Sequence, residues 1–385
     1  MRTIGVVTSA RSDYGIHFPV LSRIQADPEL RLYLIATGMH LSPEFGTTVN
    51  AIEADGFQVA DRVEMLLSSD SPEGIAKSIG LGIIGFAQSY SRYQPDLLLV
   101  VGDRFETLAA VSASLPFGIP IAHIHGGEST EGLIDEPIRH SITKMSHLHF
   151  ASTEAYGKRI IQMGEEPWRV IVSGAPSLDS INPLELMSQQ ELENKFGWDL
   201  SQPTLLVTSH PVTLEYENTA EYTKELLAAL DESGLAIVFT YPNSDTHGKV
   251  IADLINDFVA VHEQASLTVS LGSHAYFSLM NQVVAMVGNS SSGIIEAASF
   301  KLPVVNIGNR QQGRLHGRNV INVGYSRQEV FAGIQKAVSD KIRSGLRDLA
   351  NPYGDGTASQ KIVNRLKDVP LDQHLIQKRF YEWHN

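Results

Sequence analysis

The stretch Val283-Val284-Ala285-Met286-Val287-Gly288-Asn289-Ser290-Ser291-Ser292-Gly293-Ile294-Ile295-Glu296 joins an apolar run to a glycine, a serine cluster and a second apolar segment. The first five residues have the composition of a buried parallel strand, which Gly288 ends. The serines then open a predicted helix, whose free N–H groups and positive dipole end attract phosphate. This predicts a phosphate cradle from Ser290 to Gly293, with Glu296 one turn further on, in reach of ribose hydroxyls. A serine-rich turn with a helix cap is the alternative interpretation.

Short aliphatic runs alternate with longer amphipathic stretches along the whole chain, which is typical of βαβ units with parallel sheets. Candidate strands span 3–8, 31–37, 96–101, 120–124 and 147–152 in the first half, and 204–208, 236–240, 267–270, 283–287, 303–307 and 320–323 in the second. Helices fit between them, for example 15–25, 105–115, 222–232 and 294–300. The sequence therefore predicts an α/β protein of two Rossmann-like domains whose parallel sheets face a cleft.

The turn-rich segment after Val170-Ile171-Val172 marks the predicted boundary between the domains. We expect an N-terminal domain at 1–173 and a C-terminal domain at 174–365. Apolar residues recur at helical spacing within 375–383, so we also expect a helix in 366–385 that packs back on the first domain. Packing elsewhere is the alternative.

The composition excludes several classes of protein. Of the 385 residues, 43% are hydrophobic and 19% charged, as in ordinary globular proteins, and there is no cysteine for disulfides, catalytic thiols or thiolate zinc sites. The formal net charge of −13 disfavours nucleic acid as a partner. No stretch approaches the ~20 apolar residues of a membrane span, and the N-terminal apolar run is too short for a signal peptide. We expect a cytoplasmic protein without a membrane partner.

Polar residues cluster directly after the predicted strands, where parallel sheets bind ligands. In the first half these residues are Arg11, Asp103, His125, Glu128 and Asp135, and in the second half they are His210 and Arg310. Arginine suits bidentate phosphate binding, and several carboxylates and imidazoles at one sheet edge indicate acid–base chemistry. Each has a plainer interpretation, namely a helix cap for Asp103 and a core or surface histidine for His210. His123 and His125 would share a strand face, so a metal site has to be weighed, but no third ligand is fixed by spacing, and we expect no metal and no cofactor.

Other nucleotide and nucleophile motifs are absent from the sequence. There is no GxGxxG fingerprint and no P-loop lysine, which disfavours a dinucleotide enzyme and an NTPase. The serine cluster also lacks the closing glycine of a nucleophile elbow.

Taken together, these motifs resemble those of the UDP-N-acetylglucosamine 2-epimerases, in their hydrolysing branch, over nearly the whole chain. That family shares the two-domain architecture of the GT-B glycosyltransferases. The matching segments are 10–15, 37–40, 102–104, 123–128, 134–144, 210–211, 288–296 and 306–314. The resemblance implies that the second domain holds UDP, with Ser290 and Ser291 on phosphate and Glu296 on ribose. It implies that Arg11, His210 and Arg310 neutralise the diphosphate.

The resemblance also implies the reaction. UDP is eliminated as hydrogen leaves C2 of the sugar, and water then adds to the glycal, so that UDP-N-acetylglucosamine gives N-acetylmannosamine. Asp103 and Asp135 stand where the family has catalytic carboxylates. Many members carry glutamate at the position of His125, and other bacterial members have histidine there, so His125 or Glu128 could serve as the acid or base.

Several alternatives stay open at this point. The same chemistry on UDP-2,4-diacetamido-2,4,6-trideoxyglucose would lead toward legionaminic acid rather than sialic acid. A non-hydrolysing 2-epimerase, a GT-B glycosyltransferase and a non-catalytic UDP-sugar sensor would each use the same cradle. We expect a UDP-sugar as the small-molecule partner and a homo-oligomer.

Overall fold

The structure is a computed structural model that describes residues 1–67, 71–130, 134–181, 185–212, 217–241, 248–268 and 271–383. The chain forms two compact units. Unit 1 comprises Met1–Glu128, Ile134–Asp179 and Tyr353–Asn385, and unit 2 comprises Ser129–Leu133 and Ser180–Pro352. The sequence interpretation ends the first domain at 173 and has the chain rejoin it at 366. In the structure, the chain leaves unit 1 after Asp179 and rejoins it at Tyr353.

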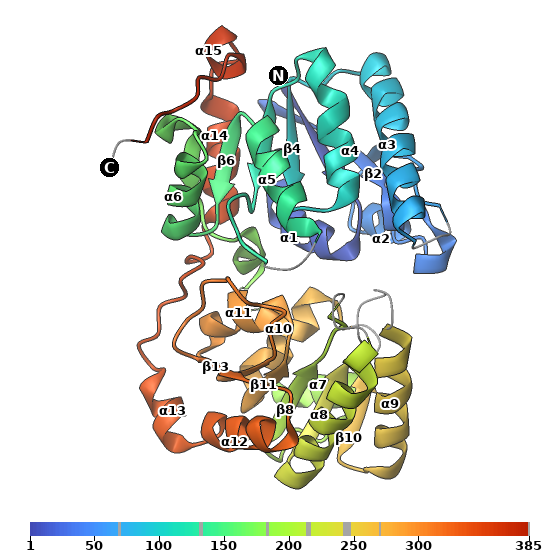
Figure 1. Cartoon of the computed structure of the whole chain (residues 1–385), viewed down its shortest axis with the longest axis vertical. Coiled ribbons are helices and arrows are strands. Elements are labelled where there is room, and N and C mark those ends of the chain that lie inside the picture. Colours follow the sequence, from blue (N-terminus) through green and yellow to red (C-terminus); the bar gives the residue numbers. More distant parts are fainter. Residues whose placement is uncertain are drawn as a thin grey trace. The chain divides into compact units, whose positions relative to one another are not determined.

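Unit 1 is built on one parallel sheet (Figure 1). Its elements are β1 (Arg2–Thr8), α1 (Arg11–Ala26), β2 (Leu30–Thr37), η1 (Gly38–Leu41), α2 (Val49–Ala54), β3 (Val59–Val63), α3 (Pro72–Arg92), β4 (Leu97–Val101), α4 (Phe105–Ser114), β5 (Ile121–Ile124), α5 (Asp135–Met145), β6 (Leu148–Ala151), α6 (Glu154–Gln162), β7 (Val170–Val172), α14 (Ala358–Asp368) and α15 (Gln373–Ile376). Among the described residues the strand order is β3-β2-β1-β4-β5-β6-β7, and all the pairs are parallel. The order reverses between β1 and β4, which makes the carboxyl ends of these strands the expected ligand site.

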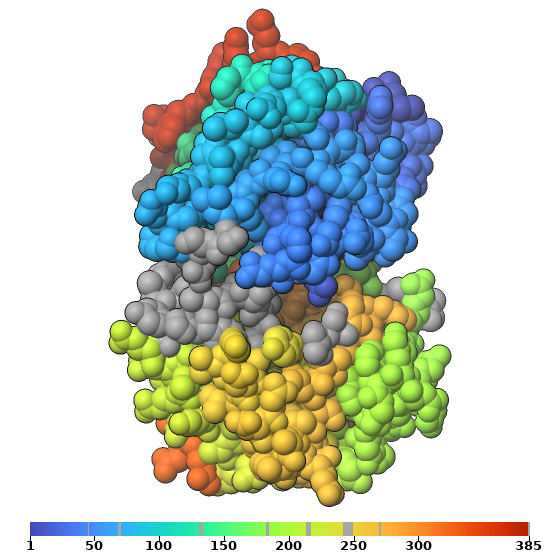
Figure 2. All heavy atoms as spheres, turned by 90° about the vertical axis from the view of Figure 1, so that its right-hand side faces the viewer, coloured from blue at the N-terminus to red at the C-terminus, as the bar shows by residue number. Residues whose placement is uncertain are grey.

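Helices cover both faces of this sheet because its central strands are apolar on both sides. On one face, α1 and α14 bury apolar side chains against β1, β2 and β4. On the other face, α3, α4 and α5 pack in a second cluster. The space-filling view shows α3, in light blue, at the surface of unit 1 (Figure 2).

Unit 2 repeats the plan with a smaller parallel sheet. Its elements are α7 (Gln189–Phe196), β8 (Thr204–Thr208), α8 (Thr219–Ser233), β9 (Ala236–Thr240), α9 (Gly248–Val261), β10 (Ala265–Thr268), α10 (Gly272–Gln282), β11 (Ala285–Gly288), α11 (Ser291–Ile295), η7 (Ala297–Phe300), β12 (Val304–Ile307), β13 (Val320–Val323), α12 (Arg327–Ala337) and α13 (Asp340–Gly345). In the described part of the chain the strand order is β10-β9-β8-β11-β12-β13. Helices α8, α9 and α12 cover one face, and α7 and α10 cover the other. The order reverses between β8 and β11, beside the serine cluster.

The predicted fold class of two parallel-sheet α/β domains is confirmed. Two edge strands are missing from the prediction: β3, and β7, which the sequence interpretation used as the domain boundary. The predicted strand 267–270 lies at β10, but its last two residues are outside the described part of the chain.

Two predicted helices differ from the structure. The helix expected at 294–300 is split into α11 and the 3-10 turn η7, with Glu296 at the junction. The helix expected within 375–383 is wrong, because the only helical turn there ends at Ile376 and residues 377–383 are irregular. These residues belong to unit 1, where they make long-range side-chain and backbone contacts instead of helical ones.

Candidate active site

Asp103 lies in the turn after β4 and is held by a buried arginine. Gly102 supplies the left-handed backbone conformation (φ 71°) that this turn requires. Arg139, 1% exposed on α5, donates to the Asp103 carboxylate, to Glu136 at 2.7 Å and to the Glu128 carbonyl at 3.2 Å. Burial acts to lower the pKa of Arg139, but the charge and hydrogen bond of Asp103, together with the charges of Glu128 and Glu136, prevail and raise it. The pair therefore places a fixed cation beside the carboxylate of Asp103.

His125 and Glu128 form a second pair after β5. Nδ1 of His125 donates to Glu128 Oε1 at 2.6 Å, and the Ser152 hydroxyl donates to the same oxygen at 2.7 Å. Both members of the pair are buried, and His125 is one of the few non-glycine residues with a left-handed backbone (φ 64°). A bond at Nδ1 fixes the tautomer, so Nε2 has no proton when the ring is neutral. The arrangement leaves Nε2 as the reactive nitrogen of a histidine–carboxylate pair.

His123 has a different environment from His125, although the sequence places them two residues apart. Strand β5 ends at Ile124, so the predicted shared strand face is wrong. Nε2 of the fully buried His123 donates to the Gly102 carbonyl at 2.7 Å, and burial lowers its pKa to about 3. His123 is therefore a neutral core histidine that fixes the backbone next to Asp103.

The turn after β1 is organised by Asp13. This buried carboxylate accepts from the backbone N–H and hydroxyl of Ser9, at 2.8 and 2.5 Å, and from the Thr8 hydroxyl at 2.5 Å, with His40 Nε2 at 3.8 Å. Burial acts to raise the pKa of Asp13, but the interactions with His40 and His17 and the hydrogen bonds from Ser9 and Thr8 prevail and hold it well below its usual range. The network fixes the start of α1, where Arg11 is exposed.

Asp135, the remaining predicted carboxylate of unit 1, is the first residue of α5 and is partly buried. The same helix carries Arg139 one turn further on. The turns after β1, β4 and β5 thus bring Arg11, Asp103, His125 and Glu128 to one edge of the unit 1 sheet.

The serine cluster of unit 2 follows β11 as predicted. Gly288 is required there (φ 135°), because a Cβ would lie 1.9 Å from the Thr208 carbonyl oxygen. Ser290 caps α11 and accepts from the Ser292 N–H at 3.3 Å. Gly293 packs on β12, since a Cβ would approach Val304 to 2.9 Å. Glu296 lies at the end of α11 and is 7% exposed.

Asn289 ties this cluster to the end of β8, a role that the sequence interpretation missed. Its side chain accepts from the His210 N–H at 2.7 Å and donates to the His210 carbonyl at 2.8 Å. Its own carbonyl accepts from Arg310 Nη1 at 3.1 Å and from Gln311 Nε2 at 2.8 Å. Asn289 therefore fixes His210 and the Arg310 loop around the cradle.

The pKa of His210 bears on the role that the resemblance implies for it, which is to neutralise the diphosphate. Burial, with the adjacent Arg310, lowers this pKa to about 3. The ring is therefore neutral near pH 7 and can offer a hydrogen bond, while Arg310 is a cation at the same edge of unit 2.

Tyr276 on α10 is a further residue that the sequence interpretation missed. Burial raises the pKa of this buried phenol to about 12, although the neighbouring hydroxyls of Ser292, Thr208 and Ser290 act to lower it. A pocket next to His210 and Asn289 is lined by the stacked rings of Tyr222 and Tyr325. No spacing pattern pointed to these aromatic residues.

Within the described residues, no group of three or more His, Cys, Asp or Glu side chains is arranged to hold a metal ion. In the same residues no helix is both long and apolar enough to cross a membrane.

Comparisons with known proteins agree with the family that the sequence resembles. The family described as UDP-N-acetylglucosamine 2-epimerase matches residues 22–367. The UDP-N,N′-diacetylbacillosamine 2-epimerase (hydrolyzing) of Legionella pneumophila is 36% identical, over 98% of this chain and 99% of that protein. The GDP/UDP-N,N′-diacetylbacillosamine 2-epimerase (hydrolyzing) of Campylobacter jejuni is 38% identical over 99% of each.

A solved structure has the same fold. The UDP-GlcNAc 2-epimerase of Neisseria meningitidis, bound to UDP-GlcNAc, superposes with a TM-score of 0.80 at 20% identity, over 95% of this chain and 99% of that one. The sequence profile spans most of the chain and the relatives match it almost end to end. The chain therefore belongs to the UDP-N-acetylglucosamine 2-epimerase family.

Proposed function

We propose that this protein is a hydrolysing 2-epimerase that converts a UDP-linked 2-acetamido sugar and water into UDP and the free C2-epimeric sugar. The observation that carries the proposal is the His125–Glu128 pair, which offers a reactive imidazole nitrogen at the same sheet edge as Asp103. The names of the two relatives, both hydrolysing 2-epimerases, support it.

The first step is an elimination. A base takes the C2 proton, and the C2–H electron pair forms the C1–C2 double bond. The C1–O bond breaks at the same time, and its own electron pair leaves with the UDP oxygen. His125 suits the base, because the carboxylate at Nδ1 stabilises the imidazolium that forms. Asp103 suits the role less well, because its carboxylate is already bonded to the guanidinium of Arg139. In this proposal Glu128 positions His125.

The second step adds water to the glycal. The hydroxyl joins C1, and a proton returns to C2 on the face opposite the one it left, which inverts that carbon. We assign Asp103 and Asp135 to this opposite face, where one orients water and the other returns the proton. Unit 2 holds the leaving group through Ser290, Ser291 and Arg310, and Ser292 and Gly293 complete the cradle. His210 donates a hydrogen bond, and Glu296 binds the ribose. Arg11 of unit 1 contacts the diphosphate.

The names of the relatives favour one sugar over the other. Both carry the name of diacetylbacillosamine, which is 2,4-diacetamido-2,4,6-trideoxyglucose. We therefore place the UDP derivative of this sugar before UDP-N-acetylglucosamine as the substrate. The cytoplasmic location and the homo-oligomeric state remain proposals, to be tested by cell fractionation and by light scattering of the purified protein.

The test is proton NMR of the protein with each UDP-sugar in deuterated water. Free UDP and a C2-deuterated manno-configured sugar are expected, with faster turnover of the diacetamido substrate. His125→Gln should lower kcat at least ~100-fold, whereas His262→Gln on the surface of unit 2 is the matched control. A product that keeps UDP would indicate a non-hydrolysing epimerase, and an intact substrate in both samples would refute the proposal.

A further inference from the structure

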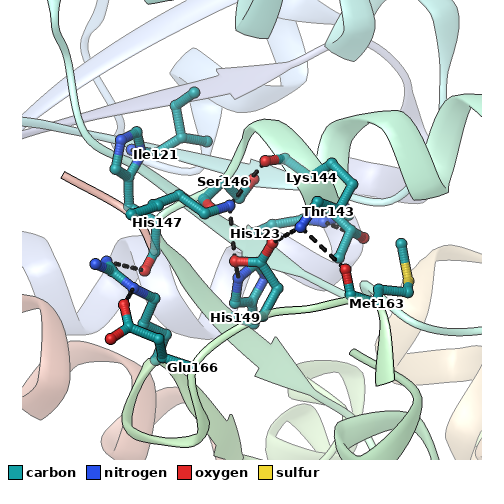
Figure 3. Close-up of polar contacts among 12 residues, drawn as sticks. Ile121, His123, Thr143, Lys144, Ser146, His147, His149, Met163 and Glu166 are labelled. Atoms are coloured by element: carbon teal, nitrogen blue, oxygen red, sulfur yellow. Dashed lines mark hydrogen bonds and ion pairs between the residues drawn. The ribbon is translucent and has the colours of Figure 1, made fainter. Parts of the chain in front are cut away.

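A buried ionic cluster lies in unit 1 away from the residues used in the mechanism. Glu165 is fully buried after α6 and accepts from three side chains: Lys144 at 2.5 Å, His149 at 3.1 Å and Lys378 at 2.7 Å. Figure 3 shows Lys144 and His149 pointing toward this cluster from α5 and β6. One of these three partners, Lys378, comes from the C-terminal segment.

The charges in the cluster depend on one another. Burial acts to raise the pKa of Glu165, but the bonds from His149, Lys144 and Lys378 prevail and lower it to about 2. Burial lowers the pKa of Lys378 and of His149. A buried carboxylate that lacks its partners is strongly unfavourable. Removal of Lys378 would therefore leave the charge of Glu165 less compensated and would destabilise the whole cluster.

Lys378 also binds the end of α5. Its ammonium donates to the carbonyl of Lys144 at 2.7 Å and to that of Ser146 at 2.6 Å. Lys144 is in the last turn of the helix, and Ser146 is its C-cap residue. A cation at this position satisfies free carbonyls and complements the helix dipole. The opposite end of the same helix begins with Asp135, and Arg139, which holds Asp103, follows one turn later.

The rest of this C-terminal segment is tied down on both sides of Lys378. Buried Arg169 donates to the carbonyls of His374 and Leu375, both at 2.8 Å. The ring of Phe380 lies on Gly164, where a Cβ would come within 2.4 Å of it, and the Tyr381 N–H donates to the Gly164 carbonyl at 2.9 Å. These contacts hold the segment against unit 1 on both sides of Lys378.

A second connection runs through the sheet. His149 of β6 is paired in register with His123 of β5, which donates to the Gly102 carbonyl next to Asp103. The cluster is therefore joined to the catalytic turn through both a helix and a strand pair.

We propose that residues 374–381 form a strap that positions α5, with Lys378 as the positioning residue that caps this helix and completes the Glu165 cluster. The strap keeps Asp135 and Arg139 in register with Asp103. The catalytic part of this inference rests on the proposed function, but the positioning of α5 does not.

The test uses the full-length Lys378→Met variant, with Lys367→Met as the matched control. Lys367 is also in unit 1 and pairs with Asp27 and Glu29 at the surface. We expect kcat with the UDP-sugar to fall at least ~10-fold in Lys378→Met, while KM and the affinity for UDP change less than twofold, because unit 2 is untouched. Lys378→Arg should restore most of kcat, since it keeps a cation that can donate to carbonyls.

Hydrogen exchange separates this proposal from the proposed function. In Lys378→Met, the amides of 139–145, which are the hydrogen-bonded amides of α5, should exchange at least ~10-fold faster than in the wild type, whether or not the wild type is an epimerase. Unchanged exchange there, or a parallel loss of kcat and UDP affinity, would overturn the proposal. If Lys378→Met does not fold, the double variant Glu165→Gln with Lys378→Met removes both charges and should show the same pattern.

Discussion

The carboxyl ends of the two sheets are built from different chemistry. In unit 1 the turns after β1, β4 and β5 hold ionisable side chains in pairs: Asp13 with His40, Asp103 with Arg139, and His125 with Glu128. In unit 2 the corresponding turns hold backbone groups, hydroxyls and an amide, and the histidine there is neutral. Paired ionisable groups suit proton transfer, whereas uncharged donors with Arg310 suit the binding of an anion without reaction. In the proposed function, chemistry and binding are therefore assigned to separate units.

The largest effect should come from breaking the pair at Asp103. Asp103→Asn removes the carboxylate but keeps its size, so we expect kcat to fall ~1000-fold while the dissociation constant of UDP stays within twofold. Turnover is measured as released UDP, and UDP binding by calorimetry. Asp348→Asn, at an exposed ion pair of unit 2, is the control. Equal losses of turnover and UDP affinity would contradict the division between units.

The next largest effect should be a greater loss of stability in unit 1 than in unit 2 at acidic pH. Burial lowers the pKa of His17 and of His147 to about 4, and that of His123 to about 3, all in unit 1. These groups have lower pKa values folded than unfolded, so the unfolded state takes up more protons between pH ~6.5 and ~4. Stability is therefore highest above that window and is lost as the pH falls through it.

The loss should be about 1–2 kcal/mol per buried histidine at pH 5. Unit 1 contains several such residues, while His210 is the one identified above in unit 2. Hydrogen exchange at pH 7 and pH 5, corrected for intrinsic rates, should show a larger loss of protection in β1, β5 and β6 than in β8 and β11. Equal losses in both sheets would contradict this expectation.

The sequence predicts the centres of both sheets well and their edges poorly, for a physical reason. Central strands such as β4 are buried on both faces, so they are continuous aliphatic runs. Edge strand β3 reads Val-Ala-Asp-Arg-Val with an exposed middle, so it lacks that composition. Strand β7 is aliphatic but has only three residues. The segment 375–383 has helical spacing, but Arg169 and Lys378 bind backbone groups that the spacing cannot reveal.

The candidate site also has features that the sequence predicts and features that it does not. Strand ends bring residues to one edge, so the positions of Asp103, His125 and the serine cluster could be predicted from periodicity and the glycines that end each strand. The hydrogen-bonding partners of the site residues could not be predicted from the sequence, because Arg139 is 36 residues from Asp103 and Asn289 is 79 residues from His210. Protonation depends on burial, which explains why His210 was expected to be charged and is neutral.

The smallest effect should come from the cradle. We expect Ser290→Ala with Ser291→Ala to weaken UDP binding ~10- to 100-fold by removing hydroxyl donors to phosphate, with kcat at saturating substrate changed less than threefold. Calorimetry with UDP measures the first effect, and initial rates at high substrate measure the second. Ser326→Ala removes a similar cap from α12 and is the control for loss of a helix cap alone. The single variants sharpen the result, because Ser290 already caps α11 whereas Ser291 has no such role. If Ser291→Ala alone leaves UDP affinity unchanged and Ser290→Ala lowers only thermal stability, the serines are a helix cap, and unit 2 must bind the nucleotide through Arg310 and its backbone.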